Sequence, residues 1–292
     1  MRVSSTLSLA SIALLAGLLP QRTRAHGPRV GWQKPPTPPN VTAYDLVYKI
    51  DGASYTGYVA FPESVSIAPG VMVAHQWYGL GDMEKYRAEE MASTMGFIAF
   101  AIDVYGTGIR ATNDAEAQAL MDELLADPTE LRKRIDAGME QLISFEASSV
   151  QAHGKHKELL ETVEVSVNAS AVAANGYCFG GLMVLELARM GGPAHAVSSF
   201  HGELGNLTAQ SDDRFQAGLT VSVHHAELDF QGDDVLRALE RELEEQNVTR
   251  WSTTYYGHME HGWTDPSLSV YSYIEAEAAH ASMFGLYRLL FP

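Results

Sequence analysis

Apolar positions follow two different periods along this chain, and the two periods alternate. Short runs that are continuously apolar, or apolar at every second position, predict strands, because successive side chains of a strand point to opposite faces. Longer segments with apolar residues three or four positions apart predict helices. The predicted strands are 44–50, 55–61, 71–75, 97–103, 170–177, 195–202, 218–225 and 249–257. The predicted helices are 81–96, 113–125, 128–145, 179–192, 233–246 and 273–291.

Turn and capping residues support these boundaries. Asp51-Gly52 lies between the first two predicted strands and predicts a hairpin. Asp82 is the predicted N-cap of the first helix, and Gly96 its C-terminal stop. The segment 148–168 shows neither period clearly and is expected to be a surface excursion. The later elements alternate between strand and helix, which predicts an α/β fold with a mostly parallel sheet, helices on both faces and an antiparallel N-terminal hairpin.

The first 40 residues do not share this pattern. Leu7–Leu19 is an uncharged apolar run preceded by a basic residue, which is typical of a signal peptide and too short to span a bilayer. Cleavage is expected after Ala25, with Ala16 as the alternative position. The chain is therefore divided into a signal peptide (1–25), a Pro-rich lead-in expected to be extended and mobile (26–40), and one folded domain (41–292).

Glycosylation signals and the cysteine count bear on the compartment. Four N-x-S/T sequons occur, at Asn40, Asn168, Asn206 and Asn247. They indicate an N-glycosylated secretory protein, the alternative being accidental sequons in a polar surface. Cys178 is the single cysteine, so no internal disulfide can form. An unpaired thiol in an oxidising compartment is expected to be buried, to be bridged to another molecule, or to have a function.

The charge balance excludes several classes of partner. Without residues 1–25 the chain has 17 basic and 36 acidic residues, a formal net charge of 17 − 36 = −19. So acidic a surface repels phosphate groups, which argues against binding to nucleic acid or to anionic membranes. No other apolar run is long enough to span a bilayer, so the mature protein is expected to be soluble.

The segment "NGYCFGG" carries the strongest chemical signal. It contains Gly176 and Gly180 around Cys178, where a predicted strand turns sharply into a predicted helix. This is the nucleophile-elbow pattern with cysteine in place of serine. The amino end of a helix favours a thiolate, and the backbone N–H of Phe179 is available to an oxyanion. The alternative is a small buried cysteine at a tight turn.

Two later residues can complete a triad with this thiol. Asp229 comes just after one predicted strand, and His261 just after the next. The carboxyl ends of parallel strands meet at one edge of a sheet, so the three side chains are expected to converge there. The order Cys, Asp, His is that of the α/β hydrolases. His261 would then transfer protons, and Asp229 would orient the imidazole.

Several motifs together resemble the dienelactone hydrolase family of α/β hydrolases. They are "HQWYGL", "DVYGTG", "GYCFGG", "HAELD" and "HGW", and the likeness extends from about residue 44 to the C-terminus. The resemblance implies a Cys-His-Asp triad that acts on a lactone or ester, with Cys178 as nucleophile, Asp229 as acid and His261 as base. It also implies that the backbone N–H of Trp77 is a second oxyanion donor, beside that of Phe179.

The chain departs from that family at two positions. Dienelactone-cleaving members carry a glutamate where this chain has Gln76, and that glutamate takes part in activating the thiol. They carry an arginine for the substrate carboxylate four residues after the histidine, where this chain has Asp265. Because neither position here supplies those charges, we expect a neutral ester or lactone as the substrate.

Other polar residues are weaker candidates. Gln76, Tyr105, Arg110 and His201 follow predicted strands at the same edge and are possible substrate contacts, with core packing, ion pairing or strand capping as alternatives. Histidine pairs occur at 224–225 and in the H-x-x-H of 258–261. The latter lies in a Gly-containing loop without the helix or cysteine ligands of a zinc site, so neither a metal nor a cofactor is expected.

The function expected from these features is cleavage of a small ester or lactone by a secreted enzyme, through a thioacyl intermediate on Cys178. One alternative keeps the triad in a thioesterase or peptide hydrolase. The other is a secreted ligand-binding protein of low activity, which the glutamine at position 76 would suit.

Overall fold

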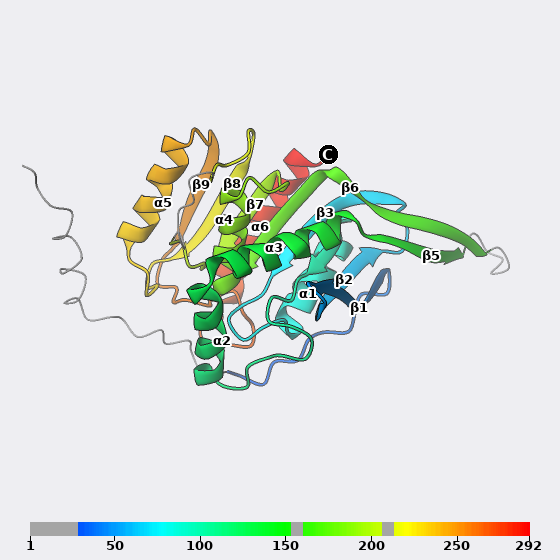
Figure 1. Cartoon of the computed structure of the whole chain (residues 1–292), viewed down its shortest axis with the longest axis horizontal. Helices are drawn as coiled ribbons and strands as arrows, with labels where there is room; N and C mark the ends of the chain where they lie inside the picture. Colours follow the sequence, from blue (N-terminus) through cyan, green and yellow to red (C-terminus); the bar gives the residue numbers. More distant parts are fainter. Residues whose placement is uncertain (1–28, 153–159, 206–212) are drawn as a thin grey trace, which may run out of the picture.

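The computed structural model describes residues 29–152, 160–205 and 213–292, which form one domain around a nine-stranded sheet (Figure 1). The strands follow the order β1-β2-β4-β3-β6-β7-β8-β9, and β5 pairs with β6. From β4 to β9 this path is parallel, whereas β1-β2, β2-β4 and β5-β6 are antiparallel. The strands are β1 (Val41–Ile50), β2 (Ala53–Pro62), β3 (Ile67–Ala74), β4 (Ile98–Ala101), β5 (Glu146–Ala152), β6 (Leu160–Tyr177), β7 (Ala196–Phe200), β8 (Thr220–Ala226) and β9 (Arg250–Tyr256).

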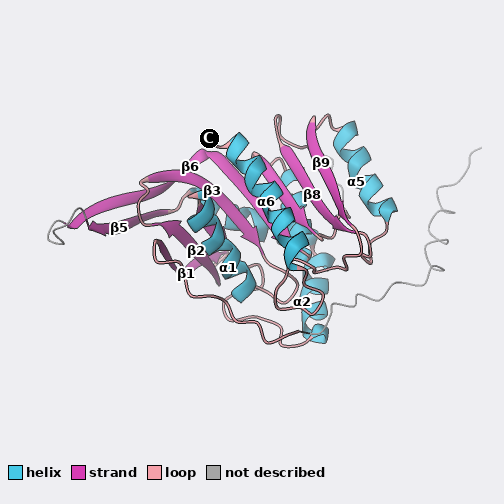
Figure 2. Cartoon of the chain, turned by 180° about the vertical axis from the view of Figure 1, so that it is seen from behind, coloured by secondary structure: helices cyan, strands magenta, loops and turns pink. Residues whose placement is uncertain are grey.

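Helices cover both faces of the sheet, so the predicted fold class is confirmed. One face carries α2 (Asp114–Ala126), α3 (Pro128–Ile143), α4 (Phe179–Arg189) and α5 (Asp233–Glu245). The other carries α1 (Asp82–Glu90), its π-helical continuation η2 (Met91–Met95) and α6 (Tyr273–Leu290), as Figure 2 shows from behind. The core is double because the strands are apolar on both sides. In β3, for example, Met72 packs on the first face, and Val71 and Val73 on the second.

The predicted N-terminal hairpin forms between β1 and β2. Asp51 and Gly52 both have positive φ (49° and 84°), the backbone conformation of a tight two-residue turn. The segment expected to be a surface excursion is a second hairpin, made of β5 and the long first half of β6, which extends away from the domain (Figure 1). Strand β5 was missed because its residues alternate poorly between apolar and polar.

A close backbone approach fixes α4 against the centre of the sheet. A Cβ atom on Gly180 would lie 2.2 Å from the carbonyl oxygen of Ala74, and one on Gly176 would lie 2.0 Å from that of Gly180. Both contacts are with backbone, which cannot move aside, so these two positions accept only glycine. The carboxyl end of β3, the end of β6 and the start of α4 therefore meet with no side chain between them.

The described part of the Pro-rich lead-in packs against the domain. Residues 29–40 form a strap along α1, and we call them the N-terminal strap. Lys34 and Thr37 both donate to the carboxylate of Glu89, at 2.6 and 2.8 Å, and the Trp32 ring packs edge-on against that of Tyr86. Sequence alone did not predict this contact, because prolines specify an extended backbone without specifying its neighbour.

No helix within the described parts of the chain has the length and apolar character needed to cross a membrane. The predicted signal peptide, residues 1–25, lies outside the described residues.

Candidate active site

Cys178 lies at the tip of the turn between β6 and α4. It has φ 55° and ψ −120°, a conformation that costs a non-glycine residue about 1–3 kcal/mol and persists only where its surroundings enforce it. Its N–H donates to the carbonyl of Phe200 on β7 at 3.1 Å, and its carbonyl accepts from Gly181 at 2.9 Å. The thiol is 2% exposed, so a reaction there is shielded from bulk water. The sharp turn expected from the sequence is therefore present.

Asp229 and His261 meet beside this thiol. Asp229 follows β8 and His261 follows β9, and Nδ1 of His261 lies 2.9 Å from Oδ2 of Asp229. The second carboxylate oxygen accepts from the backbone N–H of Gln231 at 3.1 Å, which fixes the carboxylate plane. The Cys178 side chain also interacts electrostatically with the His261 ring. The structure thus brings together the three residues that the sequence placed on three separate loops.

The charges around His261 determine its protonation. Burial lowers the pKa of its imidazole, but the neighbouring Asp229 carboxylate and the Cys178 thiol raise it, to a net value of about 10. An imidazole with that pKa is protonated at neutral pH. It can donate a proton to a leaving group, and its positive charge can stabilise a thiolate.

Two backbone N–H groups are the oxyanion donors expected from the sequence, those of Phe179 and Trp77. Phe179 is the first residue of α4, so its N–H has no carbonyl one turn earlier to bond to. Trp77 lies in the β3–α1 loop (residues 75–81), and its carbonyl accepts from the hydroxyl of Tyr105 at 2.8 Å. Tyr105 is buried, and burial first, then the charges of Cys178 and Glu203, raise the pKa of its phenol. Tyr105 therefore orients the Trp77 peptide group and packs near the thiol.

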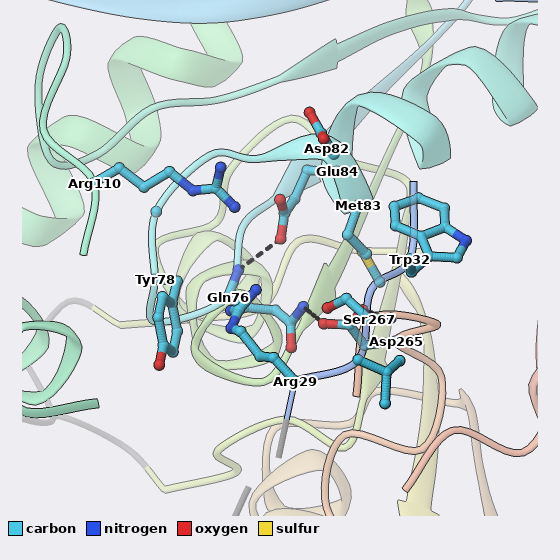
Figure 3. A pocket seen from close by; sticks show the side chains of 12 residues that line it. Arg29, Trp32, Gln76, Tyr78, Asp82, Met83, Glu84, Arg110, Asp265 and Ser267 are labelled. Carbon is cyan, nitrogen blue, oxygen red and sulfur yellow. Dashed lines mark hydrogen bonds between the residues drawn. The ribbon is translucent and has the colours of Figure 1, made fainter. Parts of the chain in front are cut away.

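Gln76 does not point at the thiol in the way an activating acid would. Its side-chain Nε2 donates to Oδ2 of Asp265 at 2.7 Å, and its backbone N–H donates to Oε1 of Glu84 at 3.2 Å (Figure 3). The two positions that depart from the family pattern are therefore hydrogen-bonded to each other. They line a cavity of about 130 Å³ with Arg29, Tyr78, Glu84 and Arg110.

Arg110 and His201 lie in different surroundings. Arg110 is exposed and reaches into the cavity beside Glu84 (Figure 3). His201 is buried directly behind His261, with ring centroids 5.1 Å apart, and its Nε2 lies 2.7 Å from the hydroxyl of Thr264. His201 thus supports the His261 ring, and Arg110 belongs to the neighbouring cavity.

His224 and His258, one from each histidine pair noted in the sequence, lie in different surroundings. His224 is buried between the hydroxyls of Ser222 and Tyr256, and burial lowers its pKa to about 4. His258 is exposed, and its backbone N–H donates to Glu227. Among the described residues no group of His, Cys, Asp or Glu has the arrangement of a metal site.

Glu84 is the main site residue that the sequence did not reveal. Its second oxygen accepts from the N–H of Gly81 at 2.8 Å, which makes Gly81 the N-cap of α1 rather than the predicted Asp82. A glutamate three residues after the N-cap is the capping-box spacing. Placing the cap one residue too late hid that spacing. Phe230, whose ring lies 4.7 Å from that of His261, was also missed.

A strand-to-helix elbow carrying a buried thiol, with an aspartate after β8 and a histidine after β9 paired beside it, is the arrangement of an α/β hydrolase. The comparisons with known proteins agree. The sequence profile described as "Dienelactone hydrolase family" matches residues 55–288, so the chain belongs to the dienelactone hydrolase family and is an ester hydrolase. Comparison with curated protein sequences finds no match.

Solved structures show the same relationship. A dienelactone hydrolase-like promiscuous phosphotriesterase from metagenomic libraries is 27% identical, with a TM-score of 0.73 over 87% of this chain and 100% of that one. The protein m3DLH is 25% identical, with a TM-score of 0.74 over the same shares. Esterase 2 of Thermogutta terrifontis, in a structure phosphorylated by paraoxon, is 15% identical, with a TM-score of 0.55 over 87% and 96%. The last likeness is one of fold.

The raised pKa of His261 predicts a pH-dependent stability. The folded imidazole binds its proton up to about pH 10 and the unfolded one only up to about 6.5. Its contribution to the unfolding free energy is therefore complete below pH 6.5 and is lost as the pH rises toward 10.

Urea unfolding measured over this interval tests the prediction. The unfolding free energy of the wild type should fall more steeply with pH than that of His261→Gln, which has no imidazole to titrate. Parallel curves for the two proteins would show that His261 does not bind its proton more tightly in the fold.

Proposed function

We propose that this protein hydrolyses neutral esters or lactones with Cys178 as the nucleophile. The observation that carries the proposal is the chain of contacts from Cys178 to His261 to Asp229, at the elbow of a dienelactone hydrolase fold. The strained backbone of Cys178 supports it as well. A cysteine with only a packing role would not need the unusual φ of 55°. In a nucleophile elbow, this backbone conformation holds the nucleophile at the amino end of the helix.

The charges suggest how the reaction starts. With His261 protonated at neutral pH, the sulfur reacts as a thiolate beside an imidazolium. Sulfur forms a bond to the carbonyl carbon, and the carbonyl electron pair moves to oxygen, where the N–H groups of Trp77 and Phe179 stabilise the negative charge. As the intermediate collapses, the bond to the alkoxy group breaks, and His261 gives that oxygen its proton. The alcohol leaves, or in a lactone stays tethered, and Cys178 holds the acyl group as a thioester.

Water completes the cycle. The now neutral His261 removes a proton from a water molecule as it attacks the thioester, and Asp229 stabilises the imidazolium that forms again. The carbon–sulfur bond breaks, which releases the carboxylic acid and restores the thiolate beside the imidazolium. Every proton is thus returned without a cofactor.

The surroundings favour an uncharged substrate. Asp265 stands where members that bind a carboxylate substrate have a cation, and the chain without residues 1–25 has a net charge of 17 − 36 = −19. Phe230 adds an apolar wall beside His261. A neutral ester or lactone meets no repulsion in such a site, whereas an anion would.

Neutral phosphotriesters are a second candidate class. The observation in favour is the likeness to the promiscuous phosphotriesterase, at 27% identity over the whole of that chain. Attack at phosphorus needs the same thiolate, the same oxyanion donors and the same imidazolium. The carboxylic ester remains the first choice because the family and its fold point to it directly.

Activity and alkylation test the nucleophile. Purified wild type should cleave short neutral esters and lactones, and Cys178→Ala should lose at least about 10³-fold in kcat/KM because no nucleophile remains. Iodoacetamide at neutral pH should label the wild type once, without ambiguity, because Cys178 is the single cysteine.

Ser93→Ala, at a half-buried position of η2 away from the loops of the triad, is the matched control and should retain both properties. The hydrolase mechanism would be contradicted if the wild type and Cys178→Ala were both inactive toward every ester, lactone and phosphotriester, and if the Cys178 thiol resisted alkylation.

We also propose that the protein is secreted and N-glycosylated, with the signal peptide ending at Ala25. The sequons support this, since Asn40, Asn168 and Asn247 are all exposed; Asn206 lies outside the described residues. Expression in a eukaryotic host should yield secreted protein that starts at His26 and loses mass with a glycosidase. A retained chain that keeps residues 1–25 and is unaffected by the glycosidase would overturn the proposal.

A further inference from the structure

We propose that the hydrogen bond between Gln76 and Asp265 is a positioning device that joins the two halves of the active site. One partner lies in the β3–α1 loop, next to the oxyanion donor Trp77. The other lies in the β9–α6 loop (residues 257–272), four residues after His261. The inference rests on the proposed function, because the pair is proposed to fix the position of Trp77 relative to His261 for the reaction of Cys178.

The pair is short and well enclosed. The Nε2–Oδ2 distance is 2.7 Å, and the two residues are only 6% and 1% exposed. Asp265 is itself held within its loop: its other oxygen accepts from the N–H of Ser267 at 2.8 Å, and its own N–H donates to the carbonyl of Gly262 at 2.9 Å. A hydrogen bond to a charged carboxylate is stronger than one between neutral groups, so this buried contact can fix the spacing of the two loops.

The position of the Gln76 side chain affects the orientation of the peptide group between Gln76 and Trp77. The Gln76 carbonyl accepts from Nδ1 of His75 at 2.6 Å and from the N–H of Gly79 at 3.0 Å. The peptide bond that follows is trans and planar, so the N–H of Trp77 points away from those donors. Glu84 holds the Gln76 N–H on the other side. Moving the Gln76 side chain therefore tilts the peptide group that carries the oxyanion donor.

The N-terminal strap also connects the β3–α1 loop to the β9–α6 loop, because it contacts both. The guanidinium of Arg29 lies 3.8 Å from the ring centroid of Tyr78 in the β3–α1 loop. The N–H of the next residue, Val30, donates to the carbonyl of Ser267 in the β9–α6 loop at 2.7 Å. Two independent sets of contacts thus fix the distance between the β3–α1 and β9–α6 loops. Residues that only lined a cavity would not need both sets.

The chemistry of the pair requires a neutral donor at position 76. Within the described residues Asp265 accepts hydrogen bonds from an amide side chain and from backbone, and it forms no ion pair. A glutamate at 76 would place two carboxylates within hydrogen-bonding distance, and these can share the site only by holding a proton between them. The other charged groups that face the pair across the cavity are Asp82 and Glu84 of α1, Arg110 of the loop after β4, and Arg29 of the strap (Figure 3).

Exchanging donor and acceptor tests the proposal with substitutions that keep the shape of both side chains. Gln76→Glu should lower kcat on a neutral p-nitrophenyl ester at least tenfold at about pH 8, with little change in KM, and recover toward about pH 5 as the carboxylates share a proton. The double variant Gln76→Glu/Asp265→Asn restores one carboxylate and one amide in reversed positions. It should return kcat to within about threefold of the wild type and remove the pH dependence that the single variant shows.

Amide hydrogen exchange provides a readout that does not depend on turnover. Gln76→Glu should speed exchange in peptides covering residues 75–81 and 257–272, and the double variant should restore protection. Thr94→Ala, at an exposed position of η2 outside both loops, is the control and should leave both measurements unchanged.

The outcomes separate this proposal from the proposed function. If Cys178→Ala and wild type are equally inert, the hydrolase function fails, and hydrogen exchange alone decides whether the pair couples the loops. If the wild type is active and Gln76→Glu matches it at every pH, or the double variant is no better than the single one, the positioning role is wrong.

Discussion

The arrangement of the site depends on one steric constraint, the contact of bare backbone between Gly180 at the start of α4 and Ala74 at the end of β3. With no side chain between them, the helix begins directly above the sheet. The connecting residue, Cys178, has to adopt a positive φ to make the turn. The end of α4 is anchored as well, because the buried carboxylate of Glu186 accepts from the guanidinium groups of Arg132 and Arg189. The helix can neither rise nor slide, so the position of the sulfur is fixed.

Electrostatics then give each carboxylate around the site a separate task. Asp229 faces an imidazole and raises its pKa, which keeps a positive charge beside the sulfur. Asp265 faces an amide, and Glu84 faces two backbone N–H groups. These last two carboxylates hold loops and exchange no proton with the reaction. An acidic protein can thus assemble a site around Cys178 because these carboxylates are each occupied by a hydrogen-bond donor.

The sequence predicted those features that follow from local pattern. The elbow was visible from the spacing of Gly176 and Gly180 around Cys178, and Asp229 and His261 were visible because parallel strands end at one edge. Their contact in the structure is the geometric consequence of that edge. Features that depend on long-range pairing were not visible. Gln76 and Asp265 are 189 residues apart, and each looked like an isolated departure from the family pattern. The packing of the strap was not visible for the same reason, since an extended Pro-rich segment does not indicate where it packs, whereas β5 was missed because its residues alternate poorly between apolar and polar.

The claim on which the account depends is that the acyl group passes through the sulfur of Cys178. Intact-mass measurement of protein quenched in acid during turnover of a p-nitrophenyl ester tests it most directly, because a good leaving group makes release of the acyl group the slower step. The account predicts one acyl group per chain, located on the peptide that contains Cys178, and none on Cys178→Ala. An acyl group on any other residue, or a chain that stays unmodified throughout turnover, would contradict it.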